Sequence, residues 1–177
     1  MGKIIFIFGG ARSGKSRYAQ ARAAEGGPRV TYLATADAGD AEMAARIARH
    51  RRDRPGAWRT VEAPRSLAAA LRRCAAESDT VLVDCLTLFL SNALAAPGAD
   101  PEGAAAEALA EMDAALAAAR EMPATVLLVS NEVGMGLVPP YPLGRAFRDL
   151  AGSVNQRVAA AADEVYFVAA GLPLRLK

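Results

Sequence analysis

Short apolar runs recur along the chain, and almost every residue within each run is apolar. They span residues 4–8, 30–33, 81–83, 126–129 and 165–168. A strand that is covered on one face alternates apolar and polar residues, whereas a strand that is covered on both faces is apolar throughout. The pattern therefore predicts five buried strands of a parallel sheet with helices on both faces.

Longer, alanine-rich segments separate the runs and have the composition of helices. They span residues 15–24, 41–52, 67–76, 86–95, 102–121 and 144–162. Asp100 is suited to cap the fifth helix, with Pro101 at its first position. The alternation of strands and helices predicts an α/β fold. Because no repeat or linker interrupts it, we expect one domain over residues 1–177.

A glycine-rich motif follows the first predicted strand and opens the first predicted helix. It fits the P-loop pattern G-x-x-x-x-G-K-[ST]. Its residues are Gly9, Gly10, Ala11, Arg12, Ser13, Gly14, Lys15 and Ser16. Backbone N–H groups and the helix N-terminus attract phosphates, Lys15 can reach the β- and γ-phosphates, and Ser16 can ligate Mg²⁺. All eight are candidate nucleotide contacts, and Lys15 is a candidate catalytic residue.

With this motif, the expected fold is a P-loop NTPase (RecA-like) three-layer fold with a mostly parallel central sheet. Asp84 follows the third apolar run, where a carboxylate could hold Mg²⁺ together with Ser16. Many strands end in Asp for turn chemistry, and the P-loop is what favours the metal role. Residues 134–142, with two glycines and three prolines, predict a long loop after the fourth of these strands. Such a loop lies at the carboxyl edge of the sheet, where open α/β folds bind ligands.

The only histidine, His50, has five arginines within four residues of it. On a helix it would share a face with Met43 and Ile47, at the rim of a core. The arginines favour a functional interpretation, because they attract a triphosphate and disfavour the imidazolium, which leaves a neutral, nucleophilic ring. The competing interpretation is a solvated basic face that binds RNA, but interleaved aromatic residues are lacking.

Composition limits the classes of protein further. The 177 residues are 53% hydrophobic and 23% charged, with a net charge of +2, which is typical of a globular protein. This weak charge does not indicate a nucleic-acid partner, and no apolar run is long enough to span a membrane. The two cysteines, Cys74 and Cys85, form no C-x-x-C pair, so we expect a reduced, cytoplasmic protein.

Taken in order, these segments resemble the bifunctional adenosylcobinamide kinase / adenosylcobinamide-phosphate guanylyltransferase family of cobalamin biosynthesis. The resemblance covers nearly the whole chain. It rests on the P-loop with Arg17, residues 32–36, residues 42–47 with His50, residues 54–55, 58–62, 84–87, 130–136 and 147–152, and Asn155 with Gln156.

The resemblance implies two reactions. A phosphoryl group from ATP or GTP passes to the aminopropanol hydroxyl of adenosylcobinamide, and GMP from GTP is then added to that phosphate through a guanylylated histidine, which matches His50. It also implies Mg²⁺, a corrinoid substrate, a homotrimer and further nucleotide contacts. Those contacts are Ala34, Thr35, Ala36, Arg51, Arg52, Asp53, Arg54, Glu62 and Asp84.

Two alternatives stay open from the sequence. One is a P-loop small-molecule kinase without the nucleotidyl step, in which His50 is structural. The other is a P-loop protein of the recombinase type that acts on DNA, for which salt-sensitive DNA binding is the expected sign.

Overall fold

The computed structural model describes residues 2–37, 55–96, 98 and 100–177. In these residues the strands are β1 (Lys3–Gly9), β2 (Val30–Ala34), β3 (Arg59–Glu62), β4 (Thr80–Asp84), β5 (Thr125–Asn131), β6 (Glu164–Ala169) and β7 (Leu172–Arg175). The helices are α1 (Lys15–Glu25), α3 (Leu67–Cys74), α4 (Leu86–Leu94), α5 (Pro101–Glu121) and α6 (Pro142–Ala161).

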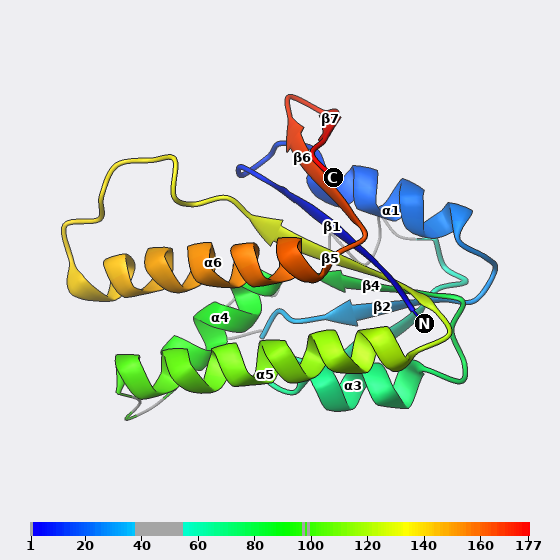
Figure 1. Ribbon diagram of the computed structural model, residues 1–177, viewed down its shortest axis with the longest axis horizontal. Coiled ribbons are helices and arrows are strands. Elements are labelled where there is room, and N and C mark those ends of the chain that lie inside the picture. The colour runs from blue at the N-terminus through cyan, green and yellow to red at the C-terminus, as the bar shows by residue number, and fades with distance from the viewer. Residues whose placement is uncertain (1, 38–54, 97, 99) are drawn as a thin grey trace.

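The strands form one sheet in the order β3-β2-β4-β5-β1-β6-β7 (Figure 1). Every neighbouring pair is parallel except β6 and β7, which form an antiparallel hairpin. Parallel neighbours need a crossover connection, for which a helix is the usual element. The mostly parallel sheet of an α/β fold, as predicted from the sequence, is confirmed.

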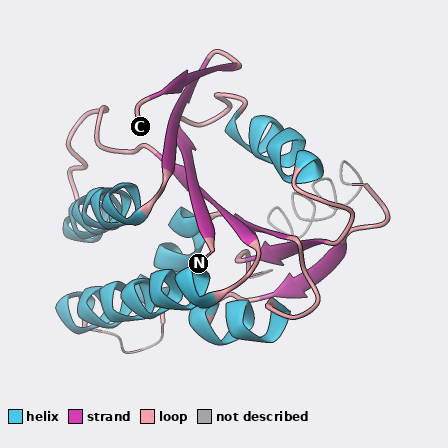
Figure 2. Ribbon diagram, turned by 45° about the vertical axis from the view of Figure 1, so that its right-hand side comes forward, coloured by secondary structure: helices cyan, strands magenta, loops and turns pink. Residues whose placement is uncertain are grey.

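Different helices cover the two faces of the sheet. α1 packs on one face, whereas α3, α4, α5 and α6 lie on the other (Figures 1 and 2). Alternate residues of β1 therefore enter different cores. Ile4 and Phe6 pack with the four helices, and Ile5 and Ile7 pack on the side of Ala19 in α1. Burial of both faces explains why the strand is apolar at every position and could be recognised from its sequence.

The two strands that the apolar runs did not predict, β3 and β7, lie at the edges of the sheet. Every residue of β7 is exposed, and in β3 only Val61 is partly buried. An edge strand gains little burial and so carries no continuous apolar run. Pro173, which cannot donate a ladder hydrogen bond, fits an edge position in β7.

The helices begin and end within two residues of the predicted bounds, apart from the predicted helix over residues 41–52, which falls outside the described residues. The predicted cap is also present, since Asp100 Oδ2 accepts a hydrogen bond from Gly103 N at 2.8 Å. Within the described ranges, no helix is both long enough and apolar enough to cross a bilayer.

The sheet places the candidate site at the carboxyl ends of β1, β4 and β5. Gly9 at the end of β1 lies beside Asn131, and Asp84 at the end of β4 lies beside Val129. Because β5 lies between them, β1 and β4 are two strand spacings apart, ~10 Å. The P-loop and Asp84 therefore share one edge of the sheet, with the end of β5 between them.

Candidate active site

The P-loop turns from β1 into α1 through a backbone that depends on glycine. Gly14 has φ +93° and caps α1, and Arg12 also has a positive φ of +57°. A Cβ atom on Gly14 would lie 3.0 Å from Gly171 Cα, and one on Gly9 would lie 2.2 Å from Val168 O. Since Gly14 has no side chain that could cap the first turn, this helix start is suited to bind an anion instead.

Two polar side chains of the loop are buried. Lys15 is 8% exposed, and its Nζ donates a hydrogen bond to Gly10 O at 3.1 Å, so the ammonium group lies against its own loop. The hydroxyl of Ser13 is buried, and it has no hydrogen-bond partner within the described part of the chain. A buried hydroxyl of this kind is suited to a ligand oxygen.

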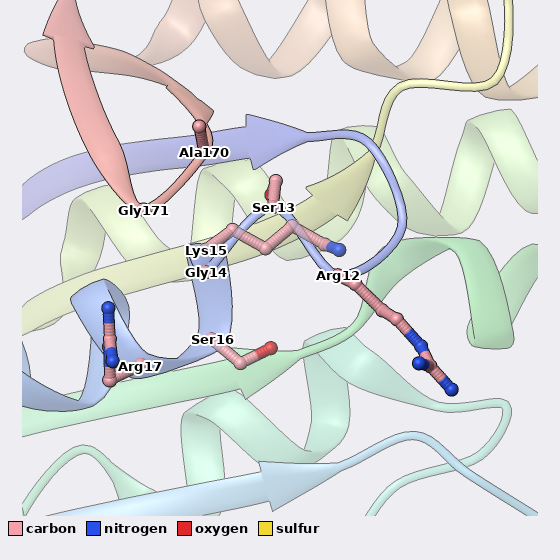
Figure 3. Close-up of a pocket in the computed structure, with 8 residues that line it drawn as sticks. All are labelled: Arg12, Ser13, Gly14, Lys15, Ser16, Arg17, Ala170 and Gly171. Atoms are coloured by element: carbon pink, nitrogen blue, oxygen red, sulfur yellow. The ribbon is translucent and has the colours of Figure 1, made fainter.

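The loop and the start of α1 line a pocket of about 550 Å³ (Figure 3). The turn between β6 and β7 forms its other wall, where Gly171 N donates to Ser13 O at 2.7 Å. No lining residue is acidic and three are cationic, so the pocket suits a polyanion. The lining residues are Arg12, Ser13, Gly14, Lys15, Ser16, Arg17, Ala170 and Gly171.

Sequence reasoning missed Ala170 and Gly171 as parts of this pocket. They lie far along the chain from the P-loop and reach it only through the β6–β7 hairpin. The single signal in the sequence was the run of small residues from Ala169 to Gly171, which indicates a tight turn but not where the turn lies.

Asp84 is half-buried, and a tyrosine from the next strand orients it. The hydroxyl of Tyr32, which is 3% exposed, donates to Asp84 Oδ2 at 3.0 Å. Thr35 holds the chain just after Asp84, because its hydroxyl donates to Cys85 O at 2.7 Å and accepts from Cys85 N at 2.8 Å. Thr35 is fully buried. In this structure its side chain therefore supports the strand end that carries Asp84.

The other positions that the family resemblance implied divide into two groups. Ala34 is buried in β2 and pairs with Glu62, which is exposed at the end of β3, while Ala36 is half-buried just after β2. These residues share the carboxyl edge of the sheet with Asp84, on the side away from the P-loop. The second group, His50, Arg51, Arg52, Asp53 and Arg54, lies outside the described residues.

Hydrogen bonds link the end of β5 to the residues that follow β4 and to the end of β1. Asn131 Nδ2 donates to Thr87 Oγ1 at 2.7 Å, and this hydroxyl lies 3.2 Å from Cys85 Sγ. Glu132 N donates to Gly9 O at 3.0 Å. Burial raises the pKa of the Cys85 thiol, and Asp84 adds to the rise, so this thiol stays protonated at neutral pH.

The loop that was predicted over residues 134–142 leaves this edge of the sheet and leads to α6 (Figure 1). It starts near the P-loop, since Glu132, two residues before it, donates from its N to Gly9 O. Several of its apolar side chains are exposed. They are Met135, Leu137, Val138 and Tyr141.

Comparison with known proteins gives one consistent result. A family model described as "Cobinamide kinase / cobinamide phosphate guanyltransferase" matches residues 5–176. The chain is 49% identical to the bifunctional adenosylcobalamin biosynthesis protein CobP of Pseudomonas aeruginosa, over 97% of this chain and 95% of the relative. It is 47% identical to the bifunctional adenosylcobalamin biosynthesis protein CobU of Salmonella typhimurium and 44% identical to CobU of Escherichia coli. Each of these matches spans 98% of this chain and 99% of the relative.

These matches confirm the resemblance that was drawn from the P-loop, the His50 segment and the strand-end motifs. The family model covers the sheet from Ile5 onwards and both sides of the pocket. The chain belongs to the cobinamide kinase / cobinamide phosphate guanyltransferase family, whose two activities make it a bifunctional enzyme of cobalamin biosynthesis.

Proposed function

We propose that the P-loop pocket binds ATP or GTP and that its γ-phosphoryl group passes to the aminopropanol hydroxyl of adenosylcobinamide. GMP from GTP is then attached to the phosphate so formed, giving adenosylcobinamide-GDP. The observation that carries the nucleotide part is the cationic pocket at an uncapped helix start, with the buried Lys15 and Ser13 inside the loop. Family membership supports the corrinoid part.

In the first reaction, the loop holds the triphosphate and Lys15 stabilises the charge on the transferred group. Ser16 and Asp84 fit a Mg²⁺ ion, because both are hard oxygen donors and the Tyr32 hydrogen bond fixes how the Asp84 carboxylate is oriented. When bound, Mg²⁺ neutralises charge on the phosphate oxygens. Phosphoryl transfer needs positioning and charge stabilisation more than covalent chemistry, and these residues supply both.

In the second reaction, we assign the nucleophile to His50. A nitrogen of the neutral imidazole attacks the α-phosphorus of GTP, so that a phosphorus–nitrogen bond forms and pyrophosphate leaves. An oxygen of the corrinoid phosphate then attacks the same phosphorus, and the imidazole leaves. The support is the sequence, since His50 is the only histidine and has five arginines around it. By the same family resemblance, Ala34–Ala36, Arg51–Arg54 and Glu62 contact nucleotide.

The family resemblance also supports a homotrimer, and exposed apolar residues offer surfaces for contacts between subunits. Leu137 is 97% exposed on the loop before α6, and Leu172 is 73% exposed on the edge strand β7. Light scattering coupled to gel filtration is expected to give the mass of three chains. The nucleotide substrates and the free thiols of Cys74 and Cys85 support a cytoplasmic location.

The decisive experiment is mass spectrometry of the intact protein after incubation with GTP and Mg²⁺. One added GMP is expected, on His50, and its bond should be labile in acid and stable in base. His50→Ala should lose the adduct and guanylyl transfer but keep much of the kinase activity, which depends on Lys15, Ser16 and Asp84. A protein that phosphorylates adenosylcobinamide without ever carrying GMP would instead be a kinase with a single activity.

A further inference from the structure

Three acidic residues stand at or just beyond the carboxyl ends of parallel strands. Glu62 ends β3, Asp84 ends β4 and Glu132 follows β5. Neighbouring strands are ~4.8 Å apart. In the order of the sheet, β5 is next to the P-loop strand β1, whereas β4 is two strands away and β3 is four. Glu132 is thus the acid of these three whose backbone lies nearest to the P-loop, and Glu132 N donates directly to Gly9 O.

The turn after β5 holds the Glu132 carboxylate in place. Gly134 N donates to Glu132 Oε1 at 2.5 Å, and Arg148 Nη2 donates to Gly134 O at 2.9 Å. A Cβ atom on Gly134 would lie 2.9 Å from Glu132 Oε1, so the carboxylate occupies space that a glycine leaves open. A carboxylate can accept bonds at both oxygens. One oxygen can therefore be fixed by the turn while the other receives a proton.

The two reactions make different demands on this acid. A hydroxyl that attacks a γ-phosphoryl group must lose a proton, and kinases place a carboxylate to accept it. The acceptor in guanylyl transfer is a phosphate, which is already ionised and needs no base. Asp84 is bonded to Tyr32 on the far side of β5, and no lining residue of the P-loop pocket is acidic.

We propose that Glu132 is the general base of the kinase reaction, an inference that rests on the proposed function above. The O–H bond of the adenosylcobinamide hydroxyl breaks and its proton passes to the Glu132 carboxylate. The hydroxyl oxygen forms a bond to the γ-phosphorus, and the bond from that phosphorus to the β–γ bridging oxygen breaks. ADP or GDP leaves, and Glu132 later returns its proton to water.

The test is Glu132→Gln, with the two reactions assayed separately. Adenosylcobinamide with ATP and Mg²⁺ reports the kinase, and adenosylcobinamide phosphate with GTP and Mg²⁺ reports guanylyl transfer. The kinase kcat should fall ~10²–10⁴-fold with little change in KM. The acid limb of the kinase pH profile should disappear, while guanylyl transfer and the GMP adduct stay near wild type. Gln keeps an oxygen that can accept from Gly134 N, so the turn is retained.

Two further variants complete the test. Glu121→Gln changes an exposed acid at the end of α5, on the opposite edge of the sheet, and should leave both reactions unchanged. Gly134→Ala keeps the acid but displaces its carboxylate, so it should slow the kinase alone.

The inference is overturned if Glu132→Gln retains full kinase activity, or if it loses both reactions equally, as a structural role would require. If the proposed function itself were wrong, the wild-type protein would lack one or both activities, and this distinguishes the two outcomes.

Discussion

The P-loop and the end of β4 both present groups to the same edge of the sheet, but they are held in opposite ways. The P-loop owes its shape to missing side chains, since Gly9 and Gly14 let the backbone approach β6 and the β6–β7 turn. The end of β4 owes its shape to side chains that bond across strands, Tyr32 to Asp84 and Thr35 to Cys85. The first arrangement leaves no room for an added atom at Gly9 or Gly14, and the second depends on hydrogen bonds between side chains and neighbouring strands.

The largest effect is expected from Lys15→Ala, which removes the charge held inside the P-loop. Both activities should fall ~100-fold or more, the usual scale for one preorganised electrostatic contact. Steady-state kinetics of the two separate reactions measures this loss. Lys177→Ala, at an exposed lysine that does not line the pocket, is the matched control. Near-normal turnover of the Lys15 variant would remove this lysine from the mechanism.

Gly14→Ala tests the backbone side of the comparison without touching any charge. The positive φ and the 3.0 Å approach to Gly171 Cα should lower the free energy of unfolding by ~1–3 kcal/mol, and GTP binding should weaken. Gly10 is its control, because a Cβ there meets nothing within 4 Å, so Gly10→Ala should keep wild-type stability. Urea unfolding of the two variants gives the difference. Equal stabilities would mean that the loop does not depend on Gly14.

Thr35→Val tests the side-chain arrangement at the end of β4. It keeps the shape of the residue but leaves the buried N–H of Cys85 without its partner and removes one of the hydrogen bonds that Cys85 O accepts, which should lower the free energy of unfolding by ~1–3 kcal/mol. Thr80 offers a control, since its buried hydroxyl has no hydrogen-bond partner among the described residues. Thr80→Val should be neutral or stabilising. If the Thr35 variant is as stable as the Thr80 variant, the Thr35–Cys85 bonds contribute nothing.

The smallest effect is expected at the opposite edge of the sheet, where an ion pair joins the first residues of β1 and β6. Glu164 binds Lys3 at 2.5 Å, and the Lys3 ammonium and the Tyr166 hydroxyl lower the pKa of Glu164 to about 2, from an ordinary value of 4.5. A lowered carboxyl pKa stabilises the fold above pH 4.5, and this contribution is lost as the pH falls from 4.5 towards 2.

Melting temperatures measured over this pH range check that expectation. Glu164→Gln should flatten the fall in Tm between pH 4.5 and 2, whereas Glu121→Gln, at an exposed acid, should follow the wild type. A wild-type slope that survives in the Glu164 variant would assign the acid sensitivity to other carboxylates.

The same contrast explains which strands and which parts of the site could be predicted from the sequence. Strands buried on both faces, such as β1 and β5, are visible as apolar runs, and the P-loop is visible because its backbone demands particular residues at fixed spacing. The edge strands β3 and β7 are not, because they bury too little. The roles of Tyr32 and Thr35 depend on the register of β2 against β4, which no local pattern reports.

Local sequence patterns also do not report how distant segments of the chain come together at the site. Glu132 could be placed at the ligand edge from its position after an apolar run, but its link to Gly9 required the order of the sheet. The roles of His50 and of Arg51–Arg54 remain predictions, as does the single domain. Mg²⁺ at Ser16 and Asp84 is likewise a prediction.

The contact between Gly171 and Ser13 has a consequence for how the enzyme is made. β1 is synthesised early, yet its two partners in the sheet, β5 and β6, and the turn that walls the pocket come from much later in the chain. Pairings between such distant segments form slowly, because a long loop must close first. During translation the whole P-loop motif is therefore present long before there is a pocket. The pocket wall that Ala170 and Gly171 supply is complete only when the β6–β7 hairpin has joined the sheet.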